Sequence, residues 1–185
     1  MQFSLDERKP TAEMTAALAF ELPAWHSVSL EKERRRLDMR WVTRERPKID
    51  RIACPWLIAR FIDKHAEFLY VPAKDVMRVA TEQGAIPYDV PDVEYGHVGE
   101  LCSFDAFLKK HNLTDPVLQR LAAIVRGADT GRPELTPQSH GLLAISMGLS
   151  KNFADDHEML RYGMVMYDAL YTWCQSGNSL GHGGG

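Results

Sequence analysis

A chain of 185 residues is long enough for one domain with a sizeable core, or for two very small domains. Its composition, 45% hydrophobic and 25% charged, is typical of a soluble globular protein. The formal net charge of -3 excludes the strong basic excess of an autonomous nucleic-acid-binding domain, so we expect no direct nucleic-acid binding. No apolar run approaches the ~18 residues that cross a bilayer, and the N-terminus lacks the apolar stretch of a secretory signal. We therefore expect a cytoplasmic protein without a membrane partner.

The first 40 residues predict a helical extension. Residues 11–20 read as one short helix behind Pro10, and residues 29–36 as a second helix that begins at Ser29. The basic run 34–36 is typical of a solvated helix face, and the alternative is contact with a partner or an anion. An exposed apolar face on these helices would favour a homodimer.

The next segment predicts a small sheet of three mostly parallel strands joined by crossover helices. Strand-like sequences alternate with helical ones, and this order is typical of right-handed crossover connections. Pro55 predicts either a kink in the first helix or a helix that begins near it, and Pro87 favours an edge position for the last strand. The expected elements are strand 41–44, helix 49–64, strand 67–72, helix 73–83 and strand 86–90.

The second half predicts helices, so the fold class is α/β to α+β. Asp115 and Pro116 form a favoured helix start, and Asp155 and Asp156 suit the positive end of a helix dipole. The expected helices are 103–112, 117–127, 137–149 and 155–174. We expect one domain over residues 41–175 and a flexible glycine-rich tail over residues 176–185.

A basic segment between the first strand and the following helix is a candidate oxyanion site. A loop that leads from a parallel strand into a helix N-terminus is suited to anions, and arginine and lysine there would donate charge-assisted hydrogen bonds. The candidate residues are Arg44, Lys48, Asp50 and Arg51, with Arg46 between them. In the alternative interpretation, Asp50 caps the helix and the basic side chains are solvated.

A glycine-containing loop after the third strand is a candidate metal site. It brings together side chains that ligate transition metals, although their spacing matches no zinc signature. The candidate ligands are Glu94, His97, Cys102 and Asp105. In the alternative interpretation, His97 and Cys102 are a hydrogen-bonded imidazole and a packed thiol.

The connection after residue 126 supplies further candidates. Asp129 could ligate a metal or orient a histidine ligand, and Arg126 could contact an oxyanion. His140 could equally be a core residue. Cys54 is a possible redox thiol, but its apolar neighbours predict a buried, inert group. Three scattered cysteines favour reduced thiols over a disulfide framework.

Several motifs resemble one family in the order in which they occur. RPKIDRIACPWLIARFID, FLYVP, GHVGELCSFD, IVRGADTGRPELTPQ and YDALYTWC are similar to the C-terminal domain of ChrB-type chromate-resistance proteins, over about residues 41–175. Longer members carry an N-terminal DNA-binding part, which residues 1–40 do not resemble, and act as chromate-responsive regulators of an efflux operon. The resemblance implies a stress-response module that senses or handles an oxyanion or a metal. It also highlights the positions Asp50, Arg51, Cys54, Arg60, His97, Cys102, Asp105, Arg126 and Asp129.

Two functions of the pocket remain open from the sequence, and a third possibility is a regulatory interaction domain whose surface, over residues 29–40, contacts a partner. The first is a binding domain for chromate, a related oxyanion or a transition metal ion, in a sensing or detoxification role. The second is a metal-dependent or thiol-based redox enzyme that uses the same pocket. No motif of a hydrolase nucleophile, a phosphate-binding loop or a zinc protease occurs in the chain, so whether it catalyses a reaction stays open.

Overall fold

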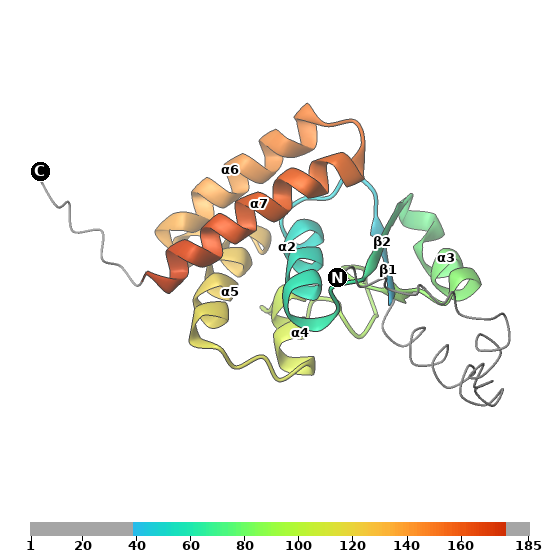
Figure 1. Ribbon diagram of the computed structural model, residues 1–185, viewed down its shortest axis with the longest axis horizontal. Coiled ribbons are helices and arrows are strands. Elements are labelled where there is room, and N and C mark those ends of the chain that lie inside the picture. Colours follow the sequence, from blue (N-terminus) through green and yellow to red (C-terminus); the bar gives the residue numbers. More distant parts are fainter. Residues whose placement is uncertain (1–38, 177–185) are drawn as a thin grey trace, which may run out of the picture. The chain divides into compact units, whose positions relative to one another are not determined.

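The computed structural model describes residues 39–176. The helices expected at 11–20 and 29–36, with the basic run 34–36, lie outside the described residues, as does the tail beyond residue 176. Within the described part, the structure confirms the predicted architecture: a small parallel sheet followed by a helical half (Figure 1).

The sheet has three parallel strands in the order β2-β1-β3. They are β1 (Arg40–Arg44), β2 (Glu67–Val71) and β3 (Ile86–Pro87). The third strand lies at an edge, as Pro87 predicts, but it is shorter than expected because the backbone turns at Asp89, which has a φ of 50°. Since the strands are parallel, their carboxyl ends meet at one edge of the sheet, and Arg44 and Asp89 both lie there.

Helix α2 (Asp50–Leu57) follows β1 and contains Pro55 without ending at it. A proline inside a helix cannot donate the hydrogen bond to the carbonyl four residues earlier. Here the Tyr70 hydroxyl, from β2, donates to that carbonyl oxygen, on Arg51, at 3.0 Å. The helix then widens into a π-helical turn, Ile58–Ile62. The sheet therefore satisfies the backbone group that the proline leaves free, and no break is needed.

Helix α3 (Val76–Gln83) forms the crossover between β2 and β3, after a short 3-10 turn at Ala73–Asp75. It ends at Gly84, whose φ of 61° is the left-handed conformation that glycine adopts most readily. Its buried side chains pack against Val42 of β1 in a small core of their own.

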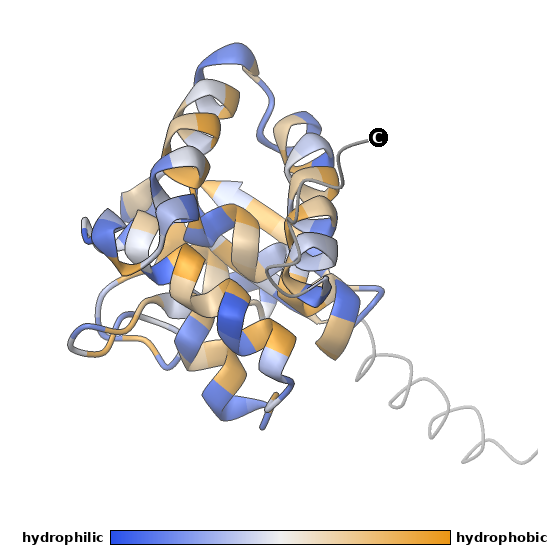
Figure 2. Cartoon of the chain, turned by 90° about the vertical axis from the view of Figure 1, so that its left-hand side faces the viewer, coloured by the Kyte–Doolittle hydropathy of each residue, from blue (hydrophilic) through white to orange (hydrophobic). Residues whose placement is uncertain are grey.

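The helical half is formed by α4 (Ser103–Lys110), α5 (Pro116–Asp129), α6 (Pro137–Asn152) and α7 (Asp156–Gln175), with a 3-10 turn at Pro133–Leu135. Helix α2 contacts α4, α5 and α7, and thereby joins the sheet to this half (Figure 1). Trp41, Trp56, Phe107 and Tyr167 belong to the shared core. The helices carry both hydrophobic and hydrophilic residues, as expected for elements with one buried face (Figure 2).

Candidate functional site

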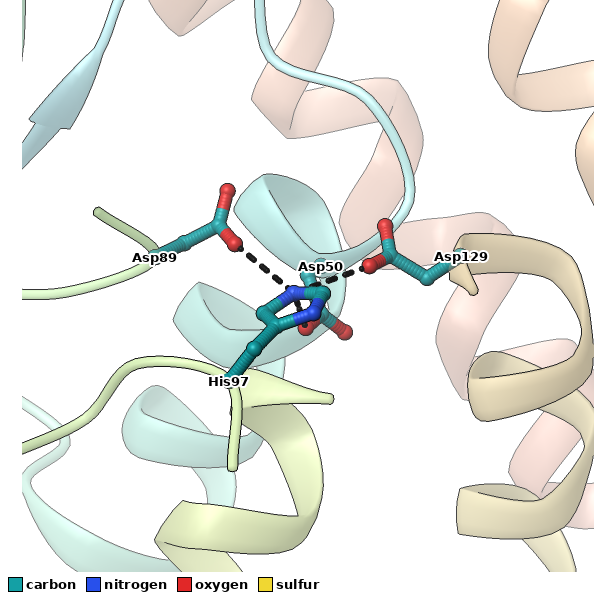
Figure 3. A group of neighbouring side chains, drawn as sticks. All are labelled: Asp50, Asp89, His97 and Asp129. Carbon is teal, nitrogen blue, oxygen red and sulfur yellow. Dashed lines mark ion pairs between the residues drawn. The ribbon is translucent and has the colours of Figure 1, made fainter. Parts of the chain in front are cut away.

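Three carboxylates converge on one histidine nitrogen at the carboxyl edge of the sheet (Figure 3). The Nε2 atom of His97 lies 3.1 Å from Asp129 Oδ2, 3.2 Å from Asp89 Oδ1 and 3.5 Å from Asp50 Oδ2. One ligand atom from each of these four residues lies within 4.8 Å of every other. We call these four residues the acidic cluster. A single imidazole N–H cannot donate to three carboxylates at once, so the cluster holds more negative charge than its histidine can pair.

Asp50 is the first residue of α2 and is completely buried. Its Oδ2 atom accepts hydrogen bonds from the backbone N–H groups of Ser103, at 2.5 Å, and Phe104, at 3.4 Å, at the start of α4. Its Oδ1 atom is buried and has no hydrogen-bond partner. An unpaired buried carboxylate oxygen is costly, and the Oδ2 atom of the same carboxylate is the one that faces His97.

The backbone before Asp50 is strained. Ile49 has a φ of 32°, which is rare for a β-branched residue. Its carbonyl oxygen accepts hydrogen bonds from Ala53 N and from the Tyr167 hydroxyl, at 3.2 Å. Packing from α7 therefore holds the turn that directs the Asp50 carboxylate into the cluster.

Asp89 follows β3 and is held by two arginines. Arg44 Nη2 donates to its backbone oxygen and to Oδ2, both at 2.9 Å, and Arg51 Nε lies 3.2 Å from Oδ2. The Ser103 hydroxyl donates to Oδ1 at 3.2 Å. These contacts fix the carboxylate with Oδ1 turned toward His97.

His97 and Asp129 complete the cluster from two other segments. His97 lies in the loop between β3 and α4, directly after Gly96, where a Cβ atom would lie 2.8 Å from the Val90 carbonyl oxygen. Asp129 is the last residue of α5. The imidazole is about two-fifths exposed, whereas the Asp129 side chain is mostly buried. Solvent therefore reaches the cluster along the His97 ring.

The four side chains of the acidic cluster shift one another's pKa values. Hydrogen bonds to Asp50 and Asp89 raise the pKa of His97 to about 10, so without a ligand the ring is an imidazolium at neutral pH. Burial and the charges of Asp50 and Asp89 raise the pKa of Asp129, and burial raises the pKa of Asp50. For Asp89, hydrogen bonds from His97 and Arg44 outweigh burial and lower the pKa.

The structure brings together only some of the residues predicted from the sequence. Of the predicted metal ligands, His97 and Asp129 lie in the cluster, and Asp50, predicted as an oxyanion residue, joins them. Asp105 instead accepts hydrogen bonds from Arg126 Nε at 2.8 Å and Nη2 at 2.6 Å, and from the backbone N–H of Cys102. Glu94 pairs with Lys110. Arg126 is thus engaged by a carboxylate, as are Arg44 and Arg51.

The remaining candidates lie outside the cluster. Lys48 is half-buried and His140 is exposed. Arg46 binds the connection between α6 and α7 by donating to the carbonyl oxygens of Phe153, Ala154 and Ser150. Cys54 and Cys102 are fully buried free thiols, and burial raises the pKa of both.

Asp89 is the member of the cluster that the sequence analysis missed. The sequence pattern places Asp89 inside the expected strand 86–90 and therefore does not mark it as a ligand. In the structure the strand ends at Pro87, and an acidic residue two positions beyond a parallel strand lies at the edge where ligands bind in α/β folds.

Comparison with known proteins identifies the family. The family described as "ChrB, C-terminal domain" matches residues 41–174. The chain belongs to this family. It is 33% identical over 133 residues to Protein ChrB of Cupriavidus metallidurans, an alignment that covers 71% of this chain and 40% of that protein. The chain thus spans less than half the length of this ChrB relative. No solved structure shows significant similarity.

No helix among residues 39–176 is both long enough and apolar enough to cross a bilayer.

Proposed function

We propose that this ChrB-type domain binds a divalent first-row transition metal ion through Asp50, Asp89, His97 and Asp129, in a sensing or detoxification role in chromate resistance. The observation that carries the proposal is the convergence of three carboxylates on His97 Nε2, one of which, Asp50, has a buried oxygen without a hydrogen-bond partner among residues 39–176. A divalent ion in place of the imidazolium proton would bind the three carboxylates and the imidazole at the point where their ligand atoms already converge.

The donor set favours particular metals. One imidazole and three carboxylates suit Mn²⁺, Fe²⁺, Co²⁺ or Zn²⁺ and do not suit Cu⁺, which prefers sulfur. The cluster contains no thiolate, because Cys102 lies outside it. Four protein ligands leave one or two coordination positions free on ions that accept five or six ligands.

An oxyanion fits this site as a ligand added after the metal. Three carboxylates would repel a dianion from the metal-free cluster, where they balance Arg44, Arg51 and the imidazolium. Replacing the His97 proton with a divalent ion changes this balance to one positive charge. Arg44 lines the open pocket beside Asp89 and His97, and its hydrogen bonds within the described residues use only Nη2. We therefore propose that chromate or a related tetrahedral oxyanion binds between the metal ion and Arg44.

The metal is tested first. Protein purified without chelators is analysed for bound elements, and chelator-treated protein is titrated with Mn²⁺ and Zn²⁺ by calorimetry and thermal unfolding. A ligand at 100 times its Kd stabilises the folded state by about 2.7 kcal/mol. We expect Asp129→Asn and His97→Ala to abolish this stabilisation, and His140→Ala, an exposed histidine outside the cluster, to retain it. Equal stabilisation of all three variants would disprove the site.

The oxyanion is tested on the metal-loaded protein. Chromate, with sulfate as a redox-inert tetrahedral control, should bind the metal-loaded form and not the chelated one. Arg44→Gln should remove this binding and leave metal uptake. Arg51→Gln serves as the matched control, because Arg51 also pairs with Asp89 but does not line the pocket. Anion binding that needs no metal would contradict this order of binding.

A further inference from the structure

The loop that carries His97 also forms a tight hairpin with two exposed apolar side chains. Val98 and Leu101 are paired through two backbone hydrogen bonds, N to O at 3.1 Å and 3.0 Å, and Gly99 makes the tight turn with a φ of 60°. Their exposed fractions are 66% and 41%.

The hairpin is held in place from outside. Arg132 Nη1 lies 2.8 Å from Glu100 Oε2, and Arg132 Nη2 donates to the Glu100 carbonyl oxygen at 3.0 Å. These contacts join the tip of the hairpin to the segment after α5 and leave Val98 and Leu101 exposed.

A pocket lies between this hairpin and helix α4. Its walls are mainly apolar and include Val98, Leu101 and Ala106, and Lys109 and Lys110 also line it. Pockets that are mostly apolar with a few polar groups are the usual sites of small organic ligands. No member of the acidic cluster lines this pocket, so it is separate from the metal site.

The charged side chains around the pocket indicate the charge of the ligand that it would bind. Glu94 is paired with Lys110, and Asp105 with Arg126, so these four groups cancel in two pairs. The Lys109 ammonium group has no ion-pair or hydrogen-bond partner among residues 39–176, where only the backbone carbonyl of this residue accepts a hydrogen bond. The pocket therefore offers apolar walls and one uncompensated ammonium group, which complements an apolar molecule with a single negative charge.

We propose that this pocket binds a small amphiphilic carboxylate, with its hydrocarbon part against Val98 and Leu101 and its carboxylate at Lys109. This inference is independent of the metal proposal, because its residues and its test involve no metal ligand. The ligand class follows from the apolar walls and the single free charge.

The test uses the full chain and octanoate as the probe, in chelator, with binding followed by calorimetry and by ligand-observed NMR. Saturable binding at one site is expected. Octanol has the same hydrocarbon part without the charge and should bind more weakly, and octylammonium, whose charge is repelled by Lys109, should bind most weakly of the three.

Surface variants locate the site. Leu101→Ser should weaken octanoate binding by about fivefold to thirtyfold through loss of apolar contact. Lys109→Met should weaken octanoate by roughly twofold to fivefold, typical of an exposed ion pair, and leave octanol unchanged. These side chains face solvent or the pocket, so folding should be retained, which circular dichroism checks.

Matched controls decide the result. Val165→Ser changes an apolar residue of α7 that is exposed to the same extent as Val98, and Lys151→Met removes an exposed charge from α6. Both should bind octanoate like the unaltered protein. Non-saturable binding, or equal losses in Val165→Ser and Leu101→Ser, would overturn the proposal.

Discussion

His97 illustrates how one residue links the charge of the site to the stability of the fold. Its imidazolium stabilises three nearby carboxylates, and its pKa in the folded protein is about 10, above the ordinary value of 6.5. A raised histidine pKa means that the folded state holds the proton more tightly than the unfolded state does. The stabilisation is fully present below about pH 6.5 and is lost as the pH rises toward 10.

This gives a prediction for the metal-free protein in chelator. The urea concentration at the unfolding midpoint should fall between pH 6.5 and pH 10, because the folded protein keeps the His97 proton over this range and the unfolded chain does not. The raised pKa of Asp129 has an effect of the same sign, but between pH 3.8 and about 7. His97→Gln should flatten this decline, whereas His140→Gln should leave it unchanged. A decline of the same slope in His97→Gln would show that the cluster does not set the pH dependence.

The cysteines give a second prediction at this scale. Cys54, Cys102 and Cys174 are buried, and burial raises the pKa of each thiol. Since the thiolate is the reactive form, all three should react slowly with iodoacetamide at pH 7.5 and rapidly in denaturant. Mass spectrometry measures the labelling of each residue. Fast labelling of Cys54 or Cys102 in the folded protein would revive the thiol-based redox hypothesis.

The candidate site shows how far single residues can be read from the sequence. His97 and Asp129 were predicted as ligands because their residue types and glycine-rich surroundings are typical of binding loops. Asp89 was missed, and Asp105 was grouped with them although it pairs with Arg126. Asp89 and Asp105 differ in their tertiary contacts, because the direction of each carboxylate depends on the helix or arginine that packs against it.

At the scale of elements, the crossing of α2 and α7 positions Asp50. Gly163 of α7 packs directly against Ile52 of α2, and a Cβ atom there would overlap the Ile52 side chain. A close approach of two helices requires a residue without a side chain at the crossing point. The same contact holds the first turn of α2, where Asp50 begins the helix.

Gly163→Ala should therefore destabilise the protein by about 1–3 kcal/mol through overpacking. Gly141→Ala is the control, because that helical glycine of α6 has no neighbour within 4 Å and alanine there should stabilise by about 0.5–1 kcal/mol. Chemical denaturation of both variants gives the comparison. Equal stability changes in the two variants would show that the α2–α7 contact is not tight.

The type of each element could be predicted from the sequence where local signals are strong. The residues at which helices and strands begin and end could be predicted less accurately. The proline at the start of α5 and the glycine at the end of α3 predicted those helix ends well. Of the two outcomes expected at Pro55, a helix that begins near it is wrong, because α2 begins at Asp50. The helix also continues past Pro55 without a break, because Tyr70, a residue distant in sequence, satisfies the free carbonyl. Sequence periodicity contains no information about such a partner.

At the scale of the whole molecule, the acidic cluster and the apolar pocket are two sites on one short loop. His97 faces the cluster, and the next residue, Val98, lines the pocket. The hairpin is also tied to the segment after α5 through Glu100 and Arg132, close in sequence to Asp129. A metal ion that joins His97 to Asp129 would therefore tighten the same loop from both ends.

This arrangement predicts linkage between the two proposed ligands. If metal binding fixes the loop, the affinity for octanoate should change when Mn²⁺ is bound, and octanoate must change the Mn²⁺ affinity by the same factor. Typical coupling of 1–3 kcal/mol corresponds to a change of about fivefold to 150-fold. Calorimetric titrations with either ligand added first measure this coupling. Arg132→Gln removes the contact that holds the hairpin, so it should reduce the change in affinity while both ligands still bind. Equal octanoate affinities with and without Mn²⁺ would mean that the sites act independently, and the loop would then be a shared support without a signalling role.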